Sequence, residues 1–225
     1  MQRRCVLLAI AVLPLTLAGC DFQEAGSSNR YQEEFRETRP LRPGGRLYVE
    51  NFNGSIEITG HDLVEIEGTK YAATEAAMKA MEIDIVSSGD SIRIRTIRPS
   101  GHHSNMGARY RIRAPASATL DRVISSNGAI RTTGIRAGLR LETSNGRVEV
   151  EDTEGPMEIR TSNGAIRVVN ARGSIDARTS NGSITVSLPE PAEGSPLELH
   201  TSNGHVELTI GVLRRNDISV STSNG

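Results

Sequence analysis

Hydrophobic and polar residues alternate along most of the chain, and short turns interrupt the alternation at regular intervals. Typical segments are 139–143 (LRLET) and 148–150 (VEV), which lie on either side of one such turn. Period-two alternation with β-branched residues predicts half-buried strands. We therefore expect an all-β protein in which each repeat contributes two short strands.

The triplet Ser-Asn-Gly recurs in the second half of the chain, with its asparagines at steps of 18, 18, 18, 22 and 21 residues. A fixed period near 20 residues is the mark of a solenoid, whose units bury their apolar faces by stacking on their neighbours. We predict a β-solenoid of the single-stranded β-helix type, with coils of 18–22 residues. The structural turn residues are Asn127, Gly128, Asn145, Gly146, Asn163, Gly164, Asn181, Gly182, Asn203 and Gly204, and the last triplet contains Asn224.

Two columns of residues after each turn are expected to point into the core. The first column holds Ile130, Val148, Ile166, Ile184 and Val206, and the second holds Thr132, Val150, Val168, Val186 and Leu208. At the turn, glycine is expected to supply a positive φ angle. The stacked asparagines are expected to form one hydrogen-bonded ladder, and the threonines that precede them a second: Thr143, Thr161, Thr179, Thr201 and Thr222.

A hairpin is the competing geometry, because Asn-Gly between alternating strands is also a strong hairpin signal. A two-residue hairpin would place Arg160 opposite Arg167 and Glu142 opposite Glu149, and like charges in direct opposition are unfavourable. The charge pattern favours the solenoid but leaves the hairpin open.

The first 19 residues have the pattern of a secretory signal peptide, with a basic start, an apolar stretch and a small-residue cleavage site. The site, Leu-Ala-Gly-Cys at 17–20, resembles the lipobox of bacterial lipoproteins. That resemblance implies cleavage before Cys20, lipidation of its sulfur and membrane anchoring through the acyl chains. Residues 20–40 are then expected to be the lipidated cysteine and a tether. Asp21 implies retention at the inner membrane in similar enteric lipoproteins, and the choice between inner and outer membrane stays open.

Residues 41–120 carry a degenerate form of the repeat, in which Ile56 and Ile58 take the two core positions. We expect this segment to cap the solenoid and to contain one short helix, at 74–81, where alanines follow a capping threonine. The regular repeats occupy 121–225. Because the sequence stops within a coil, we expect it to be truncated at its C-terminus.

Three motifs together resemble a known family: the turn at 53–56 (NGSI), the strand at 109–115 (RYRIRAP) and the serial Ser-Asn-Gly turns. The family is the bacterial "putative adhesin" group, a β-strand repeat domain of unknown function in envelope proteins. The resemblance implies the fold and an envelope location, and it supplies no catalytic residues. Some similar proteins are associated with envelope-stress regulation.

The residues themselves show no catalytic, metal or cofactor site. His102 and His103 are adjacent in a loop without a matching set of ligands, and the acidic cluster at 151–154 is best explained as a solvated bend. A net charge of −1 does not favour nucleic-acid binding. The absence of Trp and an aromatic content of 3% argue against sites that stack on sugars.

One charged feature is a candidate binding site. Five arginines alternate along two predicted strands, and they would form an anion-binding patch if those strands pair: Arg93, Arg95, Arg109, Arg111 and Arg113. The competing interpretation is that glutamates across a sheet neutralise them, namely Glu57, Glu65 or Glu67.

The sequence thus favours a non-catalytic, lipid-anchored envelope protein that presents a binding surface to an envelope polymer or an envelope protein. An envelope-stress regulator or structural protein that acts through a protein partner is the alternative. A carbohydrate-active β-helix enzyme is a third and less favoured hypothesis.

Overall fold

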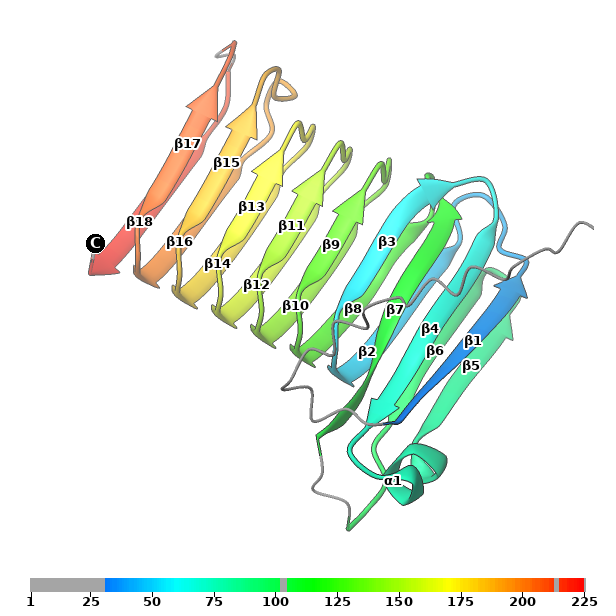
Figure 1. Ribbon diagram of the computed structural model, residues 1–225. Coiled ribbons are helices and arrows are strands. Elements are labelled where there is room, and N and C mark those ends of the chain that lie inside the picture. Colours follow the sequence, from blue (N-terminus) through cyan, green and yellow to red (C-terminus); the bar gives the residue numbers. More distant parts are fainter. Residues whose placement is uncertain (1–30, 102–104, 213–214, 225) are drawn as a thin grey trace, which may run out of the picture.

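The computed structural model describes residues 31–101, 105–212 and 215–224, which form two long sheets packed face to face (Figure 1). In spatial order, sheet A contains β1 (Tyr31–Arg39), β4 (Val64–Ala72), β7 (Met106–Pro115), β3 (Ile56–His61), β9 (Ile130–Thr133), β11 (Val148–Glu151), β13 (Ile166–Val169), β15 (Ile184–Leu188) and β17 (Val206–Ile210). Sheet B contains β18 (Ile218–Asn224), β16 (Leu197–Asn203), β14 (Ile175–Asn181), β12 (Met157–Asn163), β10 (Leu139–Asn145), β8 (Thr119–Asn127), β2 (Arg46–Asn53), β6 (Ser91–Ile97) and β5 (Glu82–Ser88).

Each regular coil contains one strand of sheet B, a Ser-Asn-Gly turn and one strand of sheet A. Successive coils pair in parallel and in register, so Thr161 lies between Thr143 and Thr179. The hairpin geometry is therefore wrong, since the strands before and after a turn belong to different sheets. The prediction of a β-solenoid is confirmed.

The inward columns form one continuous core. Ile130, Val148 and Ile166 stack in the first predicted column, and each is at most 1% exposed. The matching column of sheet B contains Leu141 and Ile159. Burial falls at β17, where Val206 and Leu208 are half-buried.

Thr132 is the polar exception in the second column. Its side chain is fully buried between Ile58 and Val150 of the adjacent coils, and its hydroxyl has no hydrogen-bond partner among the described residues.

Because a buried hydroxyl without a partner is costly, Thr132→Val should raise the free energy of unfolding by about 1–2 kcal/mol. Chemical denaturation of the two proteins measures the change. A loss of stability would show that the hydroxyl has a stabilising partner.

The N-terminal part extends the same two sheets. Ile56 and Ile58 pair with Ile130 and Thr132, which confirms their predicted core positions. The pairing becomes antiparallel at this end, between β1 and β4, β4 and β7, and β5 and β6. One hydrophobic cluster runs from β2 to β16, so the core is continuous across residue 120, the predicted end of the capping module.

Helix α1 (Glu75–Ala80) forms where predicted, and the Thr74 hydroxyl accepts a hydrogen bond from the Ala77 amide. The tether prediction for 20–40 is wrong over residues 31–39, because they form β1 at the edge of sheet A. The strand alternates too weakly to reveal itself in the sequence, since most of its side chains are exposed and polar.

Candidate functional site

The Ser-Asn-Gly turns lie at one edge of the solenoid and are joined by a ladder of side-chain amides. The Nδ2 group of each asparagine donates to Oδ1 of the asparagine one coil earlier, with distances of 2.7–2.9 Å from Asn127 to Asn224. The predicted asparagine ladder is confirmed. Asn53 adds a rung before Asn127, and its own amide donates to the Met106 carbonyl at 2.8 Å.

The predicted threonine ladder is wrong in its bonding. Thr143, Thr161 and their equivalents stack inside the turn, but each hydroxyl donates to the glycine carbonyl of the preceding coil. The Thr161 Oγ1 to Gly146 oxygen distance is 3.1 Å. The buried hydroxyls thus supply donors to backbone carbonyls of the adjacent turns, so the threonines fasten each turn to its neighbour.

The role expected for glycine is also corrected. Gly146 and Gly164 do not lie in the left-handed region of φ, in contrast to Gly54 with its φ of 113°. A Cβ atom at Gly164 would overlap the Gly146 carbonyl oxygen of the adjacent coil. Glycine is therefore required because the backbones of successive turns approach closely.

The five arginines do not form one patch, because β6 and β7 belong to different sheets and do not pair. Arg93 and Arg95 lie on β6 in sheet B, whereas the other three lie on β7 in sheet A. The error arose because alternation identifies which side of a strand is exposed but does not identify the strand's partner.

Each of the five arginines has an acidic or aromatic neighbour across its sheet. Arg113 contacts Glu65 at 2.7 Å and Arg111 lies 3.6 Å from Glu57, as in the competing interpretation. The other three arginines make two kinds of contact. Arg95 forms an ion pair with Glu50 at 3.4 Å. The guanidinium groups of Arg93 and Arg109 lie over the rings of Tyr48 and Tyr71, at 5.1 and 5.0 Å from the ring centres. Anion binding by any of them stays a prediction.

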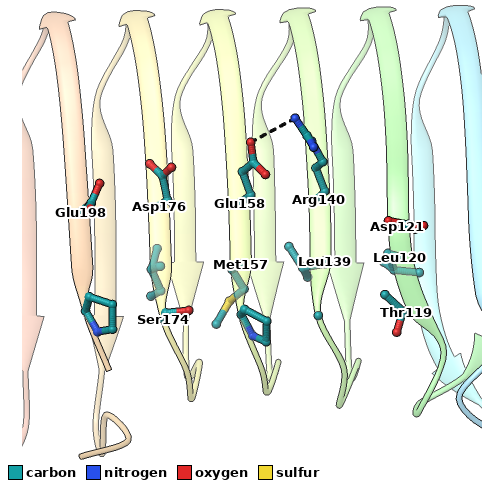
Figure 2. Close-up of a pocket in the computed structure, with 14 residues that line it drawn as sticks. Thr119, Leu120, Asp121, Leu139, Arg140, Met157, Glu158, Ser174, Asp176 and Glu198 are labelled. Atoms are coloured by element: carbon teal, nitrogen blue, oxygen red, sulfur yellow. Dashed lines mark ion pairs between the residues drawn. The ribbon is translucent and has the colours of Figure 1, made fainter. Parts of the chain in front are cut away.

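A groove on the outer face of sheet B was not foreseen. It has a volume of about 480 Å³ and crosses the starts of five successive strands, β8 to β16 (Figure 2). Small or cyclic residues form its lower side, and a row of charged side chains forms its upper side, where Figure 2 shows Asp121, Arg140, Glu158, Asp176 and Glu198. Its members are Thr119, Leu120, Asp121, Gly138, Leu139, Arg140, Pro156, Met157, Glu158, Ser174, Ile175, Asp176, Pro196 and Glu198.

The groove follows from the repeat itself. The position just before each sheet B strand holds Gly138, Pro156, Ser174 or Pro196, none of which carries a long side chain. Two residues later, the outward position carries an acid or an arginine. Stacking at about 4.8 Å per coil turns these two sequence positions into a furrow beside a charged row.

The charged row is held by ion pairs with arginines of the next outward-facing column, two residues further along each strand. These ion pairs alternate between the two columns and so form a zigzag. Arg160 contacts Glu158 at 2.9 Å and Asp176 at 3.8 Å, and Arg178 contacts Asp176 at 2.6 Å and Glu198 at 3.0 Å. The hydrogen bond and charge of Asp176 raise the pKa of Arg178. The zigzag orders carboxylates that would otherwise repel one another.

The network is balanced in charge once Arg140 is included, because its guanidinium pairs with Glu158 at 3.3 Å. At the other end of the groove, the Asp121 carboxylate accepts a hydrogen bond from the Tyr48 hydroxyl at 2.5 Å and lies 3.6 Å from Arg46. The groove therefore presents carboxylate oxygens that are fixed in place without a large net charge.

Other predicted residues contribute less. Cys20, His102 and His103 lie outside the described residues. Within the described ranges, no group of three or more His, Cys, Asp or Glu side chains is placed to hold a metal ion. The acidic bend at 151–154 lines a different hollow, with Asp152 bonded to the Asn170 amide at 2.6 Å.

Comparison with known proteins identifies the fold family. The family model described as Toastrack DUF4097 matches residues 44–224. The chain belongs to the Toastrack DUF4097 family. The matched region of this Toastrack chain begins just before β2 and ends within β18, and the family's name records a domain of unknown function.

Two solved structures resemble the Toastrack chain. One is described as a "putative cell adhesion protein" from Clostridium sporogenes ATCC 15579, with a TM-score of 0.33 and 12% identity over 84% of this chain and 100% of that one. The other is a "putative adhesin" from Parabacteroides distasonis ATCC 8503, with a TM-score of 0.27 and 10% identity over 85% and 96% of the two chains. No curated protein matches the chain. Among the described residues, no helix has the length and apolar character needed to cross a membrane.

Proposed function

We propose that this protein is a non-catalytic, lipid-anchored module of the cell envelope that binds an extended, hydroxyl-rich envelope polymer along the sheet B groove. The observation that carries the proposal is the row of ordered carboxylates across successive coils (Figure 2). Stacked repeats commonly bind through such extended surfaces. A groove that crosses several coils suits a chain that runs along the solenoid axis.

The chemistry of the row favours hydroxyl donors. A carboxylate offers about four lone-pair sites, and the arginines occupy only part of that capacity. Glu158 and Glu198 have side chains 30% and 57% exposed, so their remaining oxygen lone pairs can accept hydrogen bonds from a ligand. The charge balance of the zigzag gives little reason for a strongly cationic ligand.

The lower side of the groove supports the same choice. The exposed Pro156 and Pro196 rings offer apolar contact to the C–H groups of a sugar-like chain. Recognition of this kind needs no flat aromatic rings, which agrees with the aromatic-poor composition.

The anchor is the second part of the proposal. Its support is the lipobox-like 17–20 motif, and ten residues separate Cys20 from β1, which begins at Tyr31. Two or more acyl chains on Cys20 would hold the domain at a membrane surface.

Cys20→Ala should move the protein from the membrane to the soluble fraction on cell fractionation. Retention of that variant in the membrane would contradict the anchor.

Binding is tested by co-sedimentation with the peptidoglycan and polysaccharide fractions of isolated envelopes. The groove variant is Glu158→Ala with Glu198→Ala, and the matched control is Glu151→Ala with Glu207→Ala on sheet A. Because hydrogen bonds to charged groups contribute about 1.5–3 kcal/mol each, the groove variant should bind at least about tenfold more weakly. The control should bind as the parent does.

Circular dichroism and a denaturation curve establish that both variants keep the fold, as expected for exposed ion pairs worth at most about 1 kcal/mol each. Equal binding by parent and groove variant, or no binding by the parent to any fraction, would overturn the proposal.

A further inference from the structure

The six described Asn-Gly steps have a chemical property beyond their structural role. In an Asn-Gly step the glycine nitrogen can attack Cγ of the asparagine side chain, because glycine has no Cβ to hinder the approach. The new N–C bond closes a succinimide ring and the side-chain amide nitrogen leaves as ammonia. Water then opens the ring to aspartate or isoaspartate. The reaction needs no reactant other than water.

At each of these steps the attacking glycine nitrogen is held in a backbone hydrogen bond. The N–H groups of Gly54, Gly128, Gly146, Gly164, Gly182 and Gly204 each donate to the asparagine carbonyl of the next coil at 2.8–3.2 Å. The nitrogen must lose its proton and turn toward Cγ to react. While the coils are stacked, that proton is committed to a backbone bond along the solenoid axis.

The target side chains are held as well. The Asn145 amide donates to Asn127 at 2.8 Å, and its oxygen accepts from Asn163 at 2.9 Å. The same arrangement repeats at Asn163 and Asn181. Both partners of the reaction are thus fixed by bonds to neighbouring coils, and only separation of the coils releases them together.

We propose that the Asn-Gly steps are conformation-gated modification sites, which deamidate in coils that have opened and are protected in coils that are stacked. Local opening is the gate, because protection of a backbone amide is lost only in the open state. Deamidation at a given turn would then show that the coil containing that turn has opened.

The products would make opening irreversible. An aspartate at position 163 cannot donate to the Asn145 oxygen and adds a charge to the ladder. Isoaspartate adds a methylene to the backbone, which breaks the alternation on which inward and outward positions depend. A coil modified in this way cannot stack again as before.

The test measures deamidation site by site, by peptide mass spectrometry, in the full chain incubated in mildly alkaline buffer with and without denaturing urea. The six Asn-Gly steps should react at least about tenfold faster in urea, because every amide is then open. Asn170, which precedes Ala171, is the internal control and should react slowly in both conditions. Rates at the six sites that differ by less than about threefold between the two conditions would overturn the proposal.

A destabilised variant tests the gate without denaturant. Ile159→Ala lowers the stability of the central coils, so deamidation of Asn145 and Asn163 in buffer should rise at least about tenfold if the reaction passes through opening. Unchanged rates in this variant, with its reduced stability verified, would show that the folded turn itself reacts and would contradict the gate.

Discussion

Replacing Gly164 with alanine is expected to lower the free energy of unfolding by about 3 kcal/mol or more. The new Cβ would overlap the Gly146 carbonyl oxygen, which is backbone and cannot rotate away. Relief requires two coils to separate, and this weakens the bond from the Gly146 N–H to the Asn163 carbonyl. Chemical denaturation of parent and variant measures the loss.

Gly89 provides the matched control. It has a φ of 56° and an added Cβ would meet no atom within 4 Å, so only the left-handed backbone opposes alanine there. Gly89→Ala should cost about 1 kcal/mol. If Gly164→Ala cost no more than Gly89→Ala, close stacking of the turns would not be the reason for the glycine.

Ile159→Ala is expected to destabilise the protein by about 3–4 kcal/mol. The side chain is fully buried in the sheet B column, between Leu141 and Ala177 of the neighbouring coils. Because Ala177 is already small, little nearby side chain is available to fill the cavity. Thermal and urea unfolding give the size of the effect.

Ser162→Ala is the control for this substitution, since Ser162 lies three residues away on the exposed side of the same strand. Its removal should change stability by less than about 0.5 kcal/mol. A cost below about 1 kcal/mol for Ile159→Ala would contradict a continuous core through the stacked coils.

The repeats could be predicted because one motif specifies both the turn and the register. Aligning the asparagines placed Ile130, Val148 and Ile166 in one column, and the structure confirms that column. The helix after Thr74 was also predictable, since its capping residue and alanines act locally. Spacing and local propensity therefore identified the features that depend on neighbours in sequence or on the repeat.

Features that depend on which strands pair could not be predicted from spacing and local propensity. Arg95 and Arg111 alternate on similar strands, yet one faces outward from sheet B and the other from sheet A. Strand β1 was also missed, because an exposed edge strand has only a weak apolar pattern. The groove was missed because it joins two columns, the small residues before each strand and the acids two positions later.

The reason for glycine in the turns also lay outside local rules. Asn-Gly is compatible with a positive φ, and only the stacking of one turn on the next shows that space, not φ, is limiting. The threonines illustrate the same limit. Their column was apparent from the sequence, but the nearby Gly146 carbonyl that accepts the Thr161 hydroxyl became evident only from the fold.

The most direct test of the account is the affinity of the full chain for fragments of increasing length, prepared from whichever envelope polymer co-sediments with it. Because the row of carboxylates crosses several coils, affinity should rise with fragment length until a fragment spans the groove and should then level off. The Glu158→Ala and Glu198→Ala double variant should lose most of that rise. An affinity independent of length, or an equal rise in the variant, would contradict binding along the stacked coils.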